Sequence, residues 1–395
     1  MKKCFLYLLM VGGLGACIQS EPLNAEADIM ACKILNAKGS PETNIKGNII
    51  INNAQVLAQA NPSIDLTKLV TLTEGANISP DPARVMDYSH PQKFTVTSED
   101  GNWHKEYSVI IDTFDLPLRY DFEHYELNET GKYQVFFEET QGTALFKQYI
   151  WASGNSGFAL TGVGRNPQEY PTVSIENGID GSRAIKLETK STGQFGETVK
   201  MPIAAGNLFL GSFDVNNAVQ KPLKATRFGL PFGKKPLQLK GYYKYTPGTQ
   251  PFKAKDKNGN TVTIPGQEDE GDIYAVLYEA AELDGQALDG NNVLTSENIV
   301  ALARVEVEKK DEFTAFHVDF HYGSRIPIDW PKFIRDQRDP SDDGTAPYLS
   351  FSEEKMKNYE YNLAVVFTSS KYGAYFAGSV GSTLCIDKVE IVCEK

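Results

Sequence analysis

The stretch at residues 226–245, TRFGLPFGKKPLQLKGYYKY, limits the possible folds of this chain more than any other. Its first half contains Gly229, Pro231, Gly233 and Pro236, so neither a helix nor a regular strand ladder can continue through it. From there the residues alternate, and one face carries Leu237, Leu239, Gly241, Tyr243 and Tyr245. This period of two predicts a half-buried strand of a β-sandwich.

Gly241 leaves a gap in the middle of that apolar face. A glycine inside a strand often marks the close approach of another backbone or of a ligand. Two interpretations of the neighbouring tyrosines therefore remain open. They belong to the sandwich core, or one of them, Tyr243 or Tyr245, ends near a binding cleft.

Several motifs resemble one known family. The segment RFGLPFGKKPLQLKGYYKY, with WASGNSGF at 151–158, GDIYAVLYEA at 271–280 and LCIDKVEIVCE at 384–394, resembles the putative carbohydrate metabolism domain. That domain occurs in lipoproteins of glycan-degrading gut bacteria. The resemblance covers roughly residue 118 to the C-terminus. It implies a glycan context without implying a particular reaction.

The N-terminus reads as an export signal over residues 1–16. Lys2 and Lys3 precede the apolar run FLYLLMV, which is too short to span a membrane, and small residues follow. The sequence LGAC ending at Cys17 resembles a bacterial lipobox. The resemblance implies cleavage before Cys17, lipidation of its thiol and a tether over 17–26. An ordinary signal peptide is the alternative. The expected location is the outer membrane, with the membrane face left open.

Composition narrows the remaining classes. The formal net charge of −12 disfavours nucleic-acid partners, because an acidic surface repels phosphate backbones. Aromatic residues make up 11% of the chain, and its 33 glycines and 20 prolines provide many turns. This combination predicts an all-β protein with many short strands.

Two domains are expected after the tether. Residues 27–112 contain a clear hairpin pattern at 93–111, and GANISPDP and TVTSEDGNWHKEYSVII resemble immunoglobulin-like modules that precede surface glycan-binding lipoproteins. The predicted role of this immunoglobulin-like β-sandwich is that of a spacer, and a binding module of its own is the alternative. Residues 113–395 are predicted to form a larger jelly-roll β-sandwich, similar to carbohydrate-binding modules.

Sugar binding needs flat rings for C–H faces and polar groups for hydroxyls. Trp151 with Asn155, in a turn-rich stretch, and Trp330, in a long loop, are the first candidates. Arg227 and Tyr243 are secondary candidates. For both tryptophans, burial in a core is the competing interpretation.

Hydrolysis of a glycan would instead need two carboxylates about 5 to 9.5 Å apart across a cleft. Acidic residues gather in two predicted loops: Glu268, Asp269, Glu270, Asp272, Asp336, Asp339, Asp342 and Asp343. The sequence does not show whether any two face each other. A glycoside hydrolase is therefore the runner-up function. No serine-hydrolase, zincin or phosphate-loop motif is present.

One cofactor is predicted from resemblance alone. Jelly-roll carbohydrate-binding modules often join their first and last strands with a structural calcium ion, and Glu123 and Asp387 look like its ligands. Lys388 stands where that pattern often has Asp or Asn. Three cysteines remain after the lipobox, Cys32, Cys385 and Cys393. If 385–392 is one strand, the last two lie roughly 26 Å apart at about 3.3 Å per residue, too far to pair.

These observations predict a lipid-anchored envelope protein that binds a polysaccharide or oligosaccharide during carbohydrate use, without covalent chemistry. It would contact the membrane through its lipid only, and it could act beside other glycan-uptake proteins. A structural adhesin with no sugar ligand is a third possibility.

Overall fold

The computed structural model describes residues 23–27, 29–32, 42–43, 48–52, 70–81, 92–112, 116–141, 145–280, 283, 287–339 and 344–394. The predicted export signal and Cys17 lie outside these residues. No helix in the described ranges is long and apolar enough to cross a membrane.

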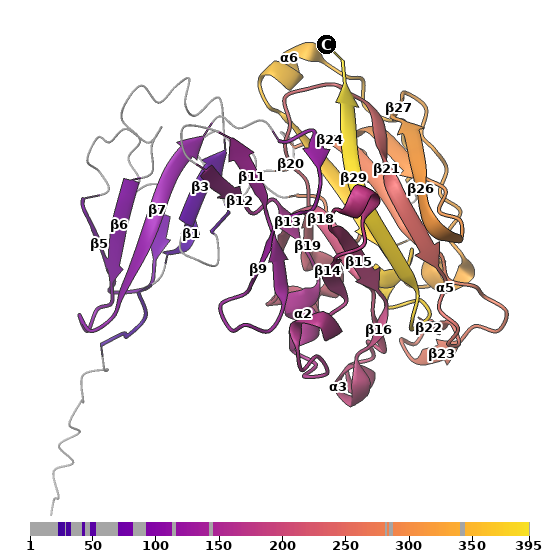
Figure 1. The fold of residues 1–395 in the computed structure, drawn as a ribbon, viewed down its shortest axis with the longest axis horizontal. Helices are drawn as coiled ribbons and strands as arrows, with labels where there is room; N and C mark the ends of the chain where they lie inside the picture. Colours follow the sequence, from indigo (N-terminus) through magenta and orange to yellow (C-terminus); the bar gives the residue numbers. More distant parts are fainter. Residues whose placement is uncertain are drawn as a thin grey trace, which may run out of the picture.

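Two antiparallel sheets form the larger sandwich (Figure 1). The eight-stranded sheet has the order β13 (Trp151–Ala152), β18 (Asn207–Phe213), β28 (Tyr361–Thr368), β24 (Asp272–Glu279), β25 (Ile299–Val305) and β27 (His321–Tyr322), with β19 (Thr226–Phe228) and β20 (Leu230–Pro231) alongside. The six-stranded sheet has the order β14 (Thr172–Ile175), β15 (Ala184–Glu188), β29 (Thr383–Cys393), β21 (Pro236–Thr246) and β26 (Lys310–Asp319), with β8 (Arg119–Tyr120) paired to β29.

The eight-stranded sheet is buried on both faces. All eight residues of β24 are buried. Ile273, Ala275 and Leu277 pack into the core between the two sheets. Tyr274 and Val276 belong to a second apolar cluster on the opposite, outer face. Loops must therefore cover the outer face of this sheet, and they create the space described below.

The half-buried strand predicted at 237–245 is β21. Leu239, Tyr243 and Tyr245 face the core, as the alternation predicts, although Leu237 is exposed. The gap at Gly241 is filled by the ring of Phe316 on β26, because a Cβ at Gly241 would lie 2.8 Å from that ring. The close neighbour is thus a side chain of the adjacent strand.

The N-terminal part contains one five-stranded sheet and one strand pair. The sheet has the order β2 (Glu42–Thr43), β3 (Asn48–Asn52), β7 (His104–Asp112), β6 (Gln92–Thr97) and β5 (Asn77–Ser79), and β1 (Ile29–Cys32) pairs with β4 (Val70–Leu72). The predicted hairpin is present, since β6 and β7 pair with Thr97 opposite His104. Gly101 at its turn has φ +72°, a conformation that favours glycine.

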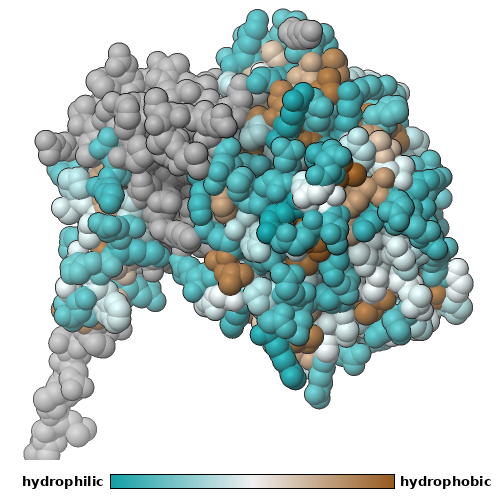
Figure 2. All heavy atoms as spheres, in the orientation of Figure 1, coloured by the Kyte–Doolittle hydropathy of each residue, from teal (hydrophilic) through white to brown (hydrophobic). Residues whose placement is uncertain are grey.

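Short elements complete the fold. The described residues contain four further two-stranded sheets: β9 (Tyr125–Leu127) with β10 (Gln134–Phe136), β11 (Glu138–Gln141) with β12 (Leu145–Gln148), β16 (Lys190–Ser191) with β17 (Ile203–Ala204), and β22 (Lys253–Lys255) with β23 (Thr261–Thr263). The α-helices are α2 (Asn155–Ala159), α3 (Gly193–Thr198), α4 (Asn217–Gln220), α5 (Lys332–Arg335) and α6 (Glu353–Lys357). The face of the molecule in Figure 2 is mostly hydrophilic, with apolar side chains in small groups.

The all-β, β-sandwich class predicted from the sequence is confirmed. Cys385 and Cys393 lie on the single strand β29 and form no disulfide with each other, as their separation along one strand predicts. The pairing of Cys32 stays open.

Candidate functional site

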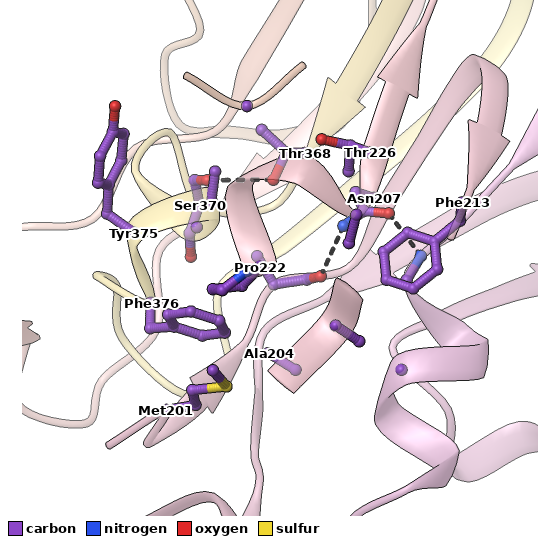
Figure 3. Close-up of a pocket in the computed structure, with 18 of the residues that line it drawn as sticks. Met201, Ala204, Asn207, Phe213, Pro222, Thr226, Thr368, Ser370, Tyr375 and Phe376 are labelled. Atoms are coloured by element: carbon purple, nitrogen blue, oxygen red, sulfur yellow. Dashed lines mark hydrogen bonds between the residues drawn. The ribbon is translucent and has the colours of Figure 1, made fainter. Parts of the chain in front are cut away.

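A cavity of about 190 Å³ lies against the outer face of the eight-stranded sheet. Its floor comes from β18, β28, β24 and β25, and its walls come from loops widely separated in the sequence. In Figure 3, Thr226 and Thr368 lie at one end of the cavity, and Phe376 and Met201 lie at the other. The cavity therefore occupies the space where the loop cover over the sheet is incomplete.

Aromatic side chains dominate the lining. Nine of them contribute: Phe158, Phe195, Phe209, Phe213, Phe228, Tyr274, Trp330, Tyr375 and Phe376. Phe209 and Phe228 pack edge to face, with ring centroids 4.9 Å apart. Such rings offer the flat apolar surface that suits the C–H face of a ring-shaped ligand.

A buried ion pair forms part of the floor. Arg304 on β25 donates two hydrogen bonds to the Asp272 carboxylate on β24, from Nε at 2.9 Å and from Nη2 at 2.6 Å. Burial alone would lower the pKa of Arg304, but the adjacent carboxylate raises it above its usual range. The bidentate geometry holds both side chains in place and leaves the pair electrically neutral.

Two buried polar atoms in the lining residues have no hydrogen-bond partner within the described part of the chain. They are the hydroxyl oxygen Oγ1 of Thr226 and the indole nitrogen Nε1 of Trp330. A buried polar atom without a partner costs about 1–3 kcal/mol, so native structures rarely leave one unmatched. Both atoms are closed off from water in the ligand-free structure, so a ligand hydroxyl can become the missing partner only after the side chain turns toward the cavity.

Arg338 fixes the wall that carries Trp330. Its guanidinium lies over the Trp330 ring, 4.4 Å from the centroid, and donates to the Tyr375 hydroxyl at 2.6 Å and to the Asn291 carbonyl at 3.1 Å. One face of the indole is therefore covered. The predicted use of Trp330 as a flat platform would therefore depend on its other face.

The other charged lining residue is also paired. Lys371 Nζ lies 2.7 Å from the Glu270 carboxylate. Asp272 is the one carboxylate in the lining among the described residues, and Arg304 neutralises it. The cavity thus combines apolar rings and neutral polar atoms with charges that already have partners.

Trp151 and Asn155 do not reach this cavity as binding groups. The Trp151 ring is 4% exposed and packs against Tyr120, Phe122 and Phe367 in the core, so it offers no face to a ligand. Its Nε1 donates to the buried Glu138 carboxylate at 2.8 Å. Asn155 is fully buried, and its amide both donates to and accepts from the backbone of Thr172. Both are structural residues.

Tyr243 and Arg227 also lie outside the cavity. Tyr243 is 3% exposed, and its hydroxyl accepts a hydrogen bond from the Glu308 backbone N–H at 3.3 Å. Arg227 points to solvent and pairs with Asp214 at 3.2 Å. Of the five predicted sugar-binding residues, only Trp330 lines the cavity.

The acidic loop residues do not meet across the cavity. Asp269 is buried, where its carboxylate accepts hydrogen bonds from Ser370, Ser379, Ser382 and the Glu270 backbone, and burial raises its pKa to about 6. Glu268, Glu270, Asp336 and Asp339 are exposed or partly exposed. Asp342 and Asp343 lie outside the described residues.

Glu123 and Asp387 flank one turn, Gly178 to Arg183. The Asp387 carboxylate accepts from Ile179 N at 2.6 Å and Ser182 Oγ at 2.9 Å, and Glu123 accepts from Arg183 N at 3.0 Å. The described residues contain no group of three or more potential metal-ligating side chains. The calcium site predicted from these two residues stays a prediction.

Sequence reasoning missed most of the lining. Thr226 lies within the stretch singled out above, yet nothing in that stretch shows which way its hydroxyl points. One available signal was the long apolar runs of β24 and β28. A strand without alternation is covered on both faces, so it predicts loops folded over the sheet.

Comparison with known proteins supports the resemblance found in the sequence. The family described as "Putative carbohydrate metabolism domain" matches residues 121–392. The chain belongs to this family. A second family, described as "SGBP, N-terminal", matches residues 36–111. No curated protein matches the chain.

Two solved structures of family relatives are similar. A Bacteroides thetaiotaomicron protein described as a putative glycoside hydrolase has 39% sequence identity and a TM-score of 0.73, with 95% of this chain and 99% of that chain covered. A Bacteroides vulgatus protein with the same description has 35% identity and a TM-score of 0.56, with 71% of this chain and 99% of that chain covered.

Proposed function

We propose that this member of the putative carbohydrate metabolism domain family binds an uncharged glycan in the cavity on the outer face of the eight-stranded sheet. The observation that carries the proposal is the pairing of an aromatic lining with two buried polar atoms, Thr226 Oγ1 and Trp330 Nε1, that lack protein partners. A sugar ring has apolar C–H faces and hydroxyls at its edge, so it matches both features.

The charges favour a neutral ligand. Asp272 and Lys371 each have an ion-pair partner, and Arg338 is engaged by Tyr375 and by the Trp330 ring. A uronic acid or sulfated sugar would place a new charge beside the Asp272–Arg304 and Lys371–Glu270 pairs, whose charges already match. Burying a charge without a counter-charge of its own is unfavourable.

The wider role proposed is capture of a glycan by a lipid-anchored envelope protein during carbohydrate use. The support is the lipobox-like sequence ending at Cys17 and the family membership. A Cys17→Ser variant that remained in the membrane fraction of cells and kept its incorporated fatty acid would refute the anchor.

Glycoside hydrolysis is the second candidate, because both solved relatives are described as putative glycoside hydrolases. Against hydrolysis at this cavity, its described lining contains one carboxylate, Asp272, and Arg304 holds both oxygens of that group. The two-carboxylate mechanism needs a second acid across the bound sugar. The cavity therefore supports binding better than cleavage.

The test is a binding screen of the protein from Ile18 onward against neutral and anionic polysaccharides and oligosaccharides, with product analysis for each hit. We expect binding of a neutral glycan without new reducing ends. Trp330→Phe removes the indole N–H and should weaken that binding. The control is Tyr120→Phe, which removes a buried hydroxyl that also lacks a partner but lies in the core. Equal binding by both variants would refute this site.

A further inference from the structure

Half of the large apolar side chains that the described residues expose lie around one side of the cavity mouth. Phe195 on α3 is 43% exposed and lines the cavity. Leu160 and Val163, at 47% and 41%, flank the lining residue Thr161. Val215, at 38%, lies two residues after the lining residue Phe213. We call these four residues the apolar rim.

The segments that carry the rim residues are in contact with one another. A Cβ at Gly193, the first residue of α3, would lie 3.0 Å from Val163, so α3 and the segment after α2 touch. The Phe213 ring lies against Gly157 on α2, 3.1 Å from where a Cβ would stand. Figure 1 shows α2 and α3 at the same end of the molecule. Isolated exposed apolar residues need no explanation, but a contiguous group beside a cavity does.

Phe195 is held firmly in this position. The turn that carries it is closed by hydrogen bonds from Val199 N to the Phe195 carbonyl at 3.1 Å and from Met201 N to the Gly196 carbonyl at 2.6 Å. Gly196 packs so tightly against Thr192 that no larger residue fits there. The backbone that carries this aromatic ring is therefore preorganised, and the exposed ring can receive a ligand group that leaves the cavity.

The volume of the cavity determines how much of a glycan lies inside it and how much contacts the apolar rim. The cavity volume of about 190 Å³ is below the ~300–1,000 Å³ of pockets that hold drug-sized ligands. The deep part is also closed by the sheet, with Asp272, Tyr274 and Arg304 in its floor, so a polymer cannot continue through it. The sheet thus blocks one direction, and a bound chain would have to leave on the side away from the sheet.

We propose that the site recognises the end of a neutral glycan chain, with the terminal sugar in the cavity and the second sugar against Phe195. This inference rests on the proposed function and names the mode of recognition at the same site. The apolar rim is its second subsite. Interior segments of a long chain are excluded by the closed floor.

The test is calorimetric titration with mono-, di-, tri- and tetrasaccharides of several neutral series: β-1,4-glucose, α-1,4-glucose, β-1,4-xylose and β-1,4-mannose. For the series that binds, we expect affinity to rise about tenfold from mono- to disaccharide, the scale of one ring stacked on an aromatic group, and then to stay level. Phe195→Ala should remove the rise from mono- to disaccharide. Phe195→Trp should restore it.

The matched control is Leu237→Ala, which truncates an equally exposed apolar side chain on the six-stranded sheet and should change nothing. Affinity that keeps rising through the tetrasaccharide, or a rise that survives Phe195→Ala, would overturn chain-end recognition while leaving glycan binding intact. No binding in any series would overturn both this inference and the proposed function.

Discussion

Replacing Thr226 by Val should weaken glycan binding and stabilise the free protein at the same time. The substitution exchanges the hydroxyl for a methyl group of similar shape. In the free protein the Thr226 hydroxyl is buried without a protein partner. Removing such a group should raise the free energy of unfolding by about 1–3 kcal/mol. A water molecule bonded to the hydroxyl in the free protein would reduce this gain. In the complex, the same hydroxyl is expected to bond a sugar hydroxyl.

The loss in binding follows from the net value of one neutral hydrogen bond, about 0.5–1.5 kcal/mol. That range corresponds to an increase in Kd of about two- to thirteenfold. Guanidinium unfolding of the ligand-free protein measures the first effect. Calorimetric titration with the bound glycan measures the second.

Thr368→Val is the matched comparison for stability, because Thr368 lines the same cavity but its hydroxyl donates to the Ser370 carbonyl at 3.0 Å. Thr368→Val removes this hydrogen bond and should therefore destabilise the free protein. The reasoning is refuted if Thr226→Val destabilises as Thr368→Val does, or if it leaves the Kd unchanged. Either result would mean that the Thr226 hydroxyl is satisfied without the ligand.

Three further predictions concern charged groups. Burial raises the pKa of Glu138 from 4.5 to about 7, so the folded state binds more protons than the unfolded state between these values, and stability falls as pH rises through this window. The free energy of unfolding of Glu138→Gln should therefore exceed that of the wild type by up to roughly 3 kcal/mol at pH 8 and should equal it at pH 4, as measured by denaturant titrations. A difference that stays constant with pH would contradict this. Asp272→Asn should lower the free energy of unfolding by about 3–5 kcal/mol because it leaves Arg304 buried and unpaired. The double variant with Asp272→Leu and Arg304→Met removes both charges, so its free energy of unfolding should fall by less. If Glu123 and Asp387 hold calcium, CaCl₂ in place of EDTA should raise the Tm of the wild type but not of Asp387→Asn; an equal Tm in both buffers removes that proposal.

The strands could be predicted because each one carries its own pattern. The alternation at 237–245 indicated β21, and the hairpin pattern at 93–111 indicated β6 and β7. These patterns depend on neighbours one to four residues away, which the sequence displays directly.

The site could not be predicted in the same way. Trp151 in its turn-rich segment looked like a surface platform, but its indole N–H meets Glu138 and its ring meets Tyr120, contacts between separate elements. The cavity joins Phe195 on α3, Thr226 on β19, and Trp330 and Tyr375 from two further segments of the chain. The sequence does not show that these four segments meet.

The apolar runs of β24 and β28 nevertheless determine where a site can form. Tyr274 and Val366 are buried on the outer face of the eight-stranded sheet, and that face must be covered by something other than the second sheet. The cover consists of irregular loops, which close less completely than a regular layer of side chains. Where the loops do not close over the sheet, the lining is rich in aromatic residues because this face of the sheet is apolar, and two polar atoms of the lining residues, Thr226 Oγ1 and Trp330 Nε1, have no partner among the described residues. A sheet that is hydrophobic on both faces and covered by loops on one of them is thus predisposed to hold a small, amphipathic ring.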